Sequence, residues 1–261
     1  MHNYNNQISG YLKFLLNTYP KKRPPLSKKL KSLFKKEYKS NRENKIISIF
    51  ESWLHRSIIK KNITSQNKTL ELGAGTLNHL PYENITSKKI YDIIEPKKYL
   101  YKNNWLKKKI NRVYKNYKIV PNNSYDRIIS CATLEHLSNL PEFLATSAFK
   151  LKNKKSFHSH SIPCEGYLAW GIANRILSGA LFRLRTGCDY NELMKHEHLN
   201  NYDEILKTIK FFYKNVKVNF SYPLFFSPHL AFYSNIYFSN PNFSNCKRYL
   251  RLANRSGKKF D

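Results

Sequence analysis

Short apolar runs alternate with helix-compatible stretches through the middle of the chain. Five runs have the length and the apolar or β-branched content of strands, and most stop at glycine, proline or polar residues: KTLELGAG, KKIYDIIEP, INRVY, YDRIISCA and KSFHSHSIP. Helix-compatible segments separate several of them, at 97–109 and in LPEFLATSAFKLK. Strands that alternate with helices of this length favour right-handed crossovers and a parallel sheet. The pattern therefore predicts an α/β domain.

The two ends of the chain depart from this alternation. Residues 1–65 are expected to be a basic N-terminal arm with helices. The basic lead-in extends to about residue 45 and is interrupted by prolines, and we expect a flexible or loosely docked arm followed by helices at 26–38 and 42–60. Near the other end, a helix is expected at 203–213. Two β-rich runs, VKVNFSYPLFF and HLAFYSNIYFS, then predict an antiparallel hairpin at the sheet edge. The last twenty residues are polar and basic and are expected to fray.

Length and composition limit the class of protein. The chain has 261 residues, of which 41% are hydrophobic, so it can form one domain with a packed core and is not globally disordered. No apolar run approaches the roughly 20 residues of a membrane-spanning helix, and the N-terminus does not read as a signal peptide. The four cysteines contain no CxxC pair, which argues against a disulfide scaffold or a zinc site. These features together predict a cytoplasmic protein.

The charge is strongly positive, with 46 Lys and Arg against 17 Asp and Glu, or +29. A chain this basic is attracted to polyanions such as nucleic acid or an anionic membrane face. The lysines are spread along the sequence, however, and the accompanying Asn, Ile, Tyr and Phe share A/T-rich codons. Codon bias therefore explains the charge better than a nucleic-acid partner, which stays open but is not favoured.

The most informative motif is the segment 70–76, LELGAGT, in which a strand ends in a Gly-x-Gly turn. Glycine allows the backbone to approach a ligand closely, and Glu95 follows at the end of the next strand, where an acid can bind ribose hydroxyls. Asn78 replaces the third glycine of a dinucleotide fingerprint, and Glu71 would be a poor neighbour for pyrophosphate. These features favour S-adenosylmethionine over NAD, and the alternative is a tight turn with no ligand.

ELGAG, then YDIIEP and SYDRIISCATLEHLSNL, resemble the motif series of class I S-adenosylmethionine-dependent methyltransferases. The resemblance covers about residues 66–163 and is closest to the group that acts on small molecules. It implies a Rossmann-like, mostly parallel sheet with helices on both faces, within a domain spanning 66–261. It also implies a substrate insertion at about 167–200, where the sequence itself reads as mixed helix and loop.

The same resemblance assigns the cofactor residues. Glu71, Gly73 and Gly75 would line the methionine part of S-adenosylmethionine, and Glu95 would hold the ribose.

The resemblance also assigns the adenine and sulfonium sides. Residues 116–119, ending at Ile119, would flank the adenine, and Cys131 and Ala132 would face the sulfonium. The chain departs from the family in having no acidic residue after the third strand until Asp126. Adenine recognition therefore falls to Asn116 or to backbone groups.

Candidate groups for the chemistry follow the fourth and fifth strands. In open α/β sheets ligands bind beyond the carboxyl ends of the strands, where Glu135, His136 and Glu165 lie. A histidine or carboxylate there could remove the proton of a hydroxyl acceptor, although His136 could equally shape the pocket wall. For His158 and His160, solvent-facing positions on the fifth strand are favoured over a role in catalysis.

A second concentration of chemistry lies in LFRLRTGCDYNELMKHEHLNN. Arg183 and Arg185 suit an anionic substrate or a solvated face, and His196 and His198 could supply a base from a lid over the site. The spacing is not HExxH, so no metal is expected. Cys131 has apolar neighbours, which favour packing over a nucleophilic role.

These observations predict a methyltransferase that acts on a small or carrier-linked acceptor. The whole sequence resembles methyltransferases of surface-polysaccharide biosynthesis, which implies a sugar hydroxyl as acceptor. The alternatives are an RNA methyltransferase, for which no RNA-binding module is visible, and a non-enzymatic basic binding protein of the same fold. The oligomeric state cannot be derived from the sequence.

Overall fold

The computed structural model describes residues 2–33, 54–59, 67–85, 87, 90–223 and 227–255. Most of the helices expected at 26–38 and 42–60 lie outside these ranges. Within them, residues 28–33 and 54–57 are helical, in agreement with the expectation.

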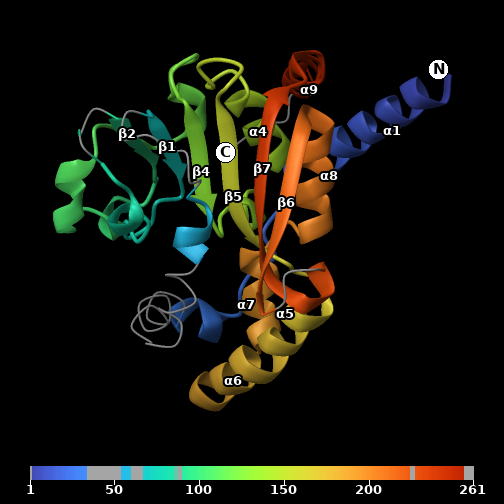
Figure 1. Ribbon diagram of the computed structural model, residues 1–261. Helices are drawn as coiled ribbons and strands as arrows, with labels where there is room; N and C mark the ends of the chain where they lie inside the picture. Colours follow the sequence, from blue (N-terminus) through green and yellow to red (C-terminus); the bar gives the residue numbers. More distant parts are fainter. Residues whose placement is uncertain are drawn as a thin grey trace.

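The described strands form one mostly parallel sheet in the order β3-β2-β1-β4-β5-β7-β6 (Figure 1). The strands are β1 (Thr69–Leu72), β2 (Tyr91–Ile94), β3 (Val113–Tyr114), β4 (Arg127–Cys131), β5 (Phe157–Pro163), β6 (Tyr213–Pro223) and β7 (Ala231–Pro241). β1 to β5 are parallel, whereas β7 pairs antiparallel with both β5 and β6. The predicted parallel sheet and C-terminal antiparallel hairpin are both confirmed.

Four helices pack together over one face of the sheet: α1 (His2–Thr18), α4 (Leu140–Ser147), α8 (Tyr202–Phe212) and α9 (Phe243–Arg255). α8 begins at a capping box formed by Asn201 and Glu204, which satisfies backbone groups at the helix start. Apolar side chains of β1 and β4, such as Leu70 and Ile128, belong to the same core as these helices.

The other face of the sheet carries a second core. Tyr91, Ile93 and Ile129 alternate with the residues of the first face, as the two-residue period of a strand requires. Ile58 and two 3-10 helices, η1 (Leu80–Tyr82) and η4 (Trp105–Lys109), contribute to this second core. A further 3-10 helix, η3 (Lys98–Leu100), precedes η4 and buries no side chain. The stretch 97–109, expected to be helical, is therefore two short 3-10 helices joined by a turn.

The expectations for the chain ends need correction. α1 is not a loosely docked arm, because Leu12 and Leu15 are buried in the main core and Tyr19 follows them there. The last twenty residues were expected to fray, but they are helical up to residue 255. α9 buries Cys246, Tyr249 and Ala253, whose spacing places them along one helix face.

The segment after β5 is almost entirely helical, where mixed helix and loop was expected. α5 (Leu168–Ile172), the π-helical segment η7 (Ala173–Gly179) and α6 (Ala180–Thr186) follow one another without a break, and α7 (Tyr190–Glu197) returns toward the sheet. In Figure 1 α6 extends away from the sheet. We call residues 168–186 the helical arm. Among the described helices, none is both long enough and apolar enough to cross a membrane.

Candidate functional site

The glycine turn after β1 has the left-handed backbone for which the sequence supplies glycine. Gly73 has φ +70° and Gly75 has φ +52°, a region that disfavours side chains. A Cβ on Gly73 would lie 2.6 Å from Cγ2 of Thr133, so only glycine fits beside the loop that follows β4. The turn therefore leaves its backbone exposed to a close neighbour, as a cofactor loop requires.

Glu95 ties the glycine turn to the end of β2. Its carboxylate is almost fully buried and accepts hydrogen bonds from the backbone N–H groups of Gly75 and Lys97, both at 2.9 Å. Each carboxylate oxygen retains a second lone pair, so Glu95 can still accept hydrogen bonds from a diol. Glu95 therefore lies where the sequence predicted a ribose-binding acid.

The side chain of Glu71 belongs to a buried cluster under the sheet. The hydroxyl of Tyr91 donates to its carboxylate at 2.9 Å, and burial raises the pKa of Glu71 despite the charge of nearby His79. No described contact joins this carboxylate to the glycine turn itself. Its assignment to the methionine part of a cofactor stays a prediction.

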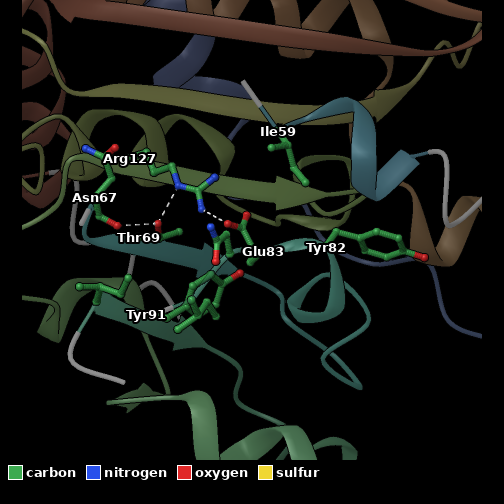
Figure 2. A pocket seen from close by; sticks show the side chains of 10 residues that line it. Ile59, Asn67, Thr69, Tyr82, Glu83, Tyr91 and Arg127 are labelled. Atoms are coloured by element: carbon green, nitrogen blue, oxygen red, sulfur yellow. Dashed lines mark hydrogen bonds and ion pairs between the residues drawn. The ribbon is translucent and has the colours of Figure 1, made fainter. Parts of the chain in front are cut away.

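A pocket opens beside this cluster, at the amino ends of the strands (Figure 2). Arg127 donates to Thr69 at 2.7 Å and to Glu83, and His79 contacts the other oxygen of Glu83 at 2.5 Å. Burial alone would raise the pKa of Glu83, but the hydrogen bond from His79 and the charge of Arg127 outweigh it and lower that pKa to about 2. The pocket is therefore lined by an ion-paired structural cluster, at the edge of the sheet opposite to the glycine turn.

The loop after β4 faces the glycine turn. Cys131 ends the strand half-buried, and Ala132 has φ +44°, unusual for a residue with a side chain. The hydroxyl of Thr133 donates to the carbonyl of Cys131 at 2.9 Å. Strained backbone of this kind persists where the surrounding structure holds it, and it concentrates at ligand sites.

The predicted adenine side is open. Ile119 is 66% exposed in the 3-10 helix η5 (Tyr117–Ile119), and the side chain of Asn116 accepts from the backbone of Lys118. Asn116 therefore uses its carbonyl oxygen to shape the loop. Adenine contacts by either residue stay a prediction.

Four predicted residues from three segments of the chain do meet beyond β4 and β5. Glu135 and His136 lie in the 3-10 helix η6 (Leu134–His136), Glu165 follows β5, and His198 caps α7. Nδ1 of His198 lies 2.6 Å from Glu165, the rings of His136 and His198 are 4.9 Å apart, and His136 Nε2 lies 4.0 Å from Glu135. We call these four residues the Glu135 cluster.

Burial sets the protonation of the Glu135 cluster. Glu135 is 1% exposed, one of its oxygens has no hydrogen-bond partner among the described residues, and burial raises its pKa to about 7. Burial and the charge of His198 lower the pKa of His136 to about 3. Burial alone would also lower the pKa of His198, but its hydrogen bond to Glu165 and the charge of Glu135 raise it.

The tautomer of His136 follows from its contacts. Nδ1 lies 2.8 Å from the carbonyl of Glu197 and therefore carries the proton. Nε2, on the side of Glu135, is left with a lone pair. A neutral histidine and a carboxyl with a pKa near neutrality thus lie side by side, a pair able to accept a proton.

Two groups of side chains have the spacing of metal ligands. Glu135, His136 and His198 each place one ligand atom within 4.8 Å of the others, and so do His55, His79 and Cys131. Either group could hold a divalent cation. The expectation of no metal stays a prediction.

Three predicted residues lie away from the Glu135 cluster. Nδ1 of His196 is 2.6 Å from the carbonyl of Pro24, so its ring faces the N-terminal segment. Arg183 and Arg185 are exposed on α6 in the helical arm, and no described contact joins them to the cluster. Their roles in catalysis or substrate binding stay predictions.

The histidines of β5 are a correction. His158 and His160 are fully buried, not solvent-facing, because β5 lies inside the sheet between β4 and β7. Ser130 lies 2.7 Å from Nδ1 of His160, Tyr213 lies 3.0 Å from Nε2 of His158, and the two rings meet at 3.1 Å. Their polar atoms are thus satisfied inside the core, which is a structural role.

The N-terminal segment contacts the backbone around the Glu135 cluster. These contacts were not predicted from the sequence. Arg23 donates to the backbone carbonyls of His136, His196 and Glu197, and Tyr19 donates to Asn200 at 2.9 Å. The sequence PKKRPP carries no pattern that would reveal these contacts, since the partners lie more than a hundred residues away.

The fold of the chain matches solved methyltransferases. An S-adenosylmethionine-dependent methyltransferase from Thermotoga maritima, described as a possible histamine N-methyltransferase, aligns with a TM-score of 0.53 and 15% identity, over 79% of this chain and 95% of its own. A second from Archaeoglobus fulgidus aligns with a TM-score of 0.52 and 15% identity, over 74% and 93%. No family model and no curated protein sequence matches the chain. At this identity the similarity establishes the fold: the chain has the Rossmann-like fold of S-adenosylmethionine-dependent methyltransferases.

Proposed function

We propose that this chain is a methyltransferase that uses S-adenosylmethionine to methylate a hydroxyl group of a small or carrier-linked acceptor. The observation that carries the proposal is the Glu135 cluster, which lies at the same edge of the sheet as the glycine turn. Ligands of open α/β sheets bind at this edge, and both the glycine turn and the buried acid at the end of β2 suit an adenine nucleoside.

The residues fit the cofactor in three respects. Gly73 leaves no room for a side chain against Thr133, Glu95 keeps acceptor capacity for ribose hydroxyls, and Ile119 presents an exposed apolar surface to an adenine ring. S-adenosylmethionine supplies the methyl group and its own leaving group, so the protein mainly positions the reactants.

The chain's own task is to place the hydroxyl and receive its proton. Glu135 has a pKa of about 7, so near neutral pH a large fraction is ionised and can accept a proton. His136 stays neutral and offers Nε2 only as a hydrogen-bond acceptor for the hydroxyl, while Glu165 orients His198. Removal of the proton as the methyl group arrives makes the hydroxyl a better nucleophile.

A sugar hydroxyl is the acceptor we propose, in surface-polysaccharide biosynthesis. Its support is the sequence resemblance together with a cluster suited to a hydroxyl. We further propose that the reaction takes place in the cytoplasm, where the four cysteines, none of which forms a disulfide in the structure, would stay reduced.

Thermal unfolding with S-adenosylhomocysteine tests the cofactor, with NAD as control. A ligand at 100 times its Kd stabilises the folded state by about 2.7 kcal/mol. At roughly 2–4 °C per kcal/mol the melting temperature should rise by several degrees. An equal shift with NAD, or no shift with either, would contradict the proposal.

Transfer of a labelled methyl group to nucleotide sugars, to lipid-linked sugars and to RNA then tests the acceptor. Methylation of a sugar hydroxyl is expected. Methylation of RNA alone, with binding that weakens steeply as salt rises, would replace the sugar with nucleic acid.

A further inference from the structure

The helical arm exposes a row of large apolar side chains. Leu184 is 84% exposed, Leu181 66%, Leu168 59% and Ile172 49%. On the opposite side of the arm, Phe182 is buried against Leu30 of the N-terminal segment. The arm is therefore attached along one side and presents apolar side chains on the other.

The π-helical segment η7 brings these side chains into register. In an unbroken α-helix, at about 100° per residue, Leu184 would lie roughly 120° around the axis from Ile172. A π-helix has wider turns and advances less per residue. By this geometry the seven residues of η7 turn α6 back, toward the side of the arm that carries Leu168 and Ile172.

Basic side chains flank this apolar row. Arg175, Arg183 and Arg185 are exposed on the same arm. Lys28, Lys29 and Lys31 are exposed on the N-terminal segment that packs against it through Leu30. The acidic residues of α7 and its N-cap are Asp189, Glu192 and Glu197, of which Glu192 is engaged by the backbone of Ser27 and Glu197 lies beside His136. Among the described residues, the exposed charged side chains of the arm and of 28–31 are therefore all basic.

We propose that the helical arm docks the protein on an anionic membrane surface. An amphipathic helix with apolar side chains on one face and Arg or Lys at its borders lies in the membrane interface, since the apolar groups enter the acyl boundary while the cations contact lipid headgroups. The basic character of the whole chain, +29, adds long-range attraction to the same surface. The inference does not depend on methyl transfer, although a membrane-bound enzyme would meet a lipid-linked acceptor directly.

Flotation with vesicles tests the arm in the full-length protein. Phosphatidylcholine vesicles with and without phosphatidylglycerol are mixed with the wild type and with Leu181→Asp/Leu184→Asp. The wild type should float with the anionic vesicles, and the double variant should bind them at least roughly tenfold more weakly. Trp105→Asp is the matched control, because Trp105 is 68% exposed in η4, outside the arm, and should leave vesicle binding unchanged.

A second variant separates charge from apolar insertion. Arg175→Glu/Arg183→Glu should bind more weakly in low salt, and its binding should depend less on salt than that of the wild type. Because all substituted positions are exposed, melting curves should show that the variants remain folded.

Three results would overturn the proposal. The first is no binding of the wild type to anionic vesicles, and the second is equal binding by the leucine variant, which would assign the effect to net charge alone. The third is a concentration-dependent dimer that the leucine variant dissociates in the absence of vesicle binding, which would make the arm an interface between two copies.

Discussion

Two buried glutamates lie at opposite edges of the same sheet, and their surroundings shift their pKa values in opposite directions. Glu83 lies beside the first residues of β1 and β4. It contacts His79 and accepts a hydrogen bond from Arg127, and these interactions lower its pKa to about 2. Glu135, just beyond the end of β4, is 1% exposed, and its pKa rises to about 7.

This difference in pKa distinguishes an ion-paired structural cluster around Glu83 from a cluster around Glu135 that is suited to proton transfer. At the amino edge, opposite charges meet in pairs, so the ionised glutamate is the stable form. At the carboxyl edge, one oxygen of Glu135 has no hydrogen-bond partner among the described residues, and the charged form is costly. A carboxyl held near its titration point is suited to moving protons, whereas a permanently ionised one is suited to holding a fold together.

The largest expected effect is on turnover. Glu135→Gln keeps the shape of the side chain but removes its capacity to take a proton, so kcat for methyl transfer should fall by roughly 10²–10⁴. Affinity for S-adenosylhomocysteine, measured by calorimetry, should stay the same. Glu192→Gln on α7 is the matched control, since its carboxylate binds the backbone of Ser27, away from the cluster.

The same assay tests whether the cluster works without a cation. Turnover should be unchanged after chelation with EDTA, because the sequence predicts no metal. A loss that Mn²⁺ or Mg²⁺ restores would show that a cation is needed, and a weaker metal dependence in Glu135→Gln would then assign Glu135, His136 and His198 rather than His55, His79 and Cys131 as its ligands.

The next effect is on stability, at the amino edge. Glu83→Gln leaves the guanidinium of Arg127, 2% exposed, without its partner, and should cost about 3–5 kcal/mol in the free energy of unfolding. Urea denaturation measures this. The double variant Glu83→Leu/Arg127→Leu should recover much of the loss, and a cost below about 1 kcal/mol for the single variant would show that the pair is not important for the fold.

A further prediction concerns the pH dependence of stability that Glu135 contributes. The folded pKa of Glu135 is above its ordinary value of 4.5, so between pH 4.5 and 7 the folded state holds a proton that the unfolded state has released. Its contribution to stability therefore falls as pH rises through this window. Glu135→Gln removes the effect and should gain up to about 3 kcal/mol over the wild type across it.

The wild-type profile alone cannot be used for this comparison. His136, His158 and His160 have lowered pKa values, so their contribution to stability is lost as pH falls below about 6.5, the opposite direction. The measurement is therefore the difference between variant and wild type, from urea unfolding at several pH values. A difference that does not change with pH would contradict the raised pKa of Glu135.

The comparison also shows which site residues can be predicted from the sequence. Gly73, Gly75 and Glu95 were found because a strand that ends in glycine, followed by a strand that ends in an acid, is a local pattern. Glu135 and His136 were found because they follow a strand directly. In each case the position along the chain determines the edge of the sheet on which the residue lies.

Contacts between distant segments could not be predicted in this way. Arg23 meets carbonyls of residues 136, 196 and 197, and only the folded chain brings these together. The burial of His158 and His160 depends on β7 pairing beside β5, which requires a chain reversal some seventy residues later. The buried stripe of α9, by contrast, was present in the spacing of Cys246, Tyr249 and Ala253 and was obscured by the basic residues around it.

The smallest expected effect tests which edge of the sheet binds a ligand. Ile119 lies after β3 and is 66% exposed, whereas Ile90 lines the pocket at the amino edge. If adenine covers Ile119, Ile119→Ala removes apolar area that binding would bury, at a cost of about 1 kcal/mol, and Kd for S-adenosylhomocysteine should rise roughly fivefold. Ile90→Ala should leave Kd unchanged. A reversed result in calorimetry would move the nucleoside to the pocket of Figure 2, and the ion-paired cluster of Glu83 and Arg127 would then be the ligand site.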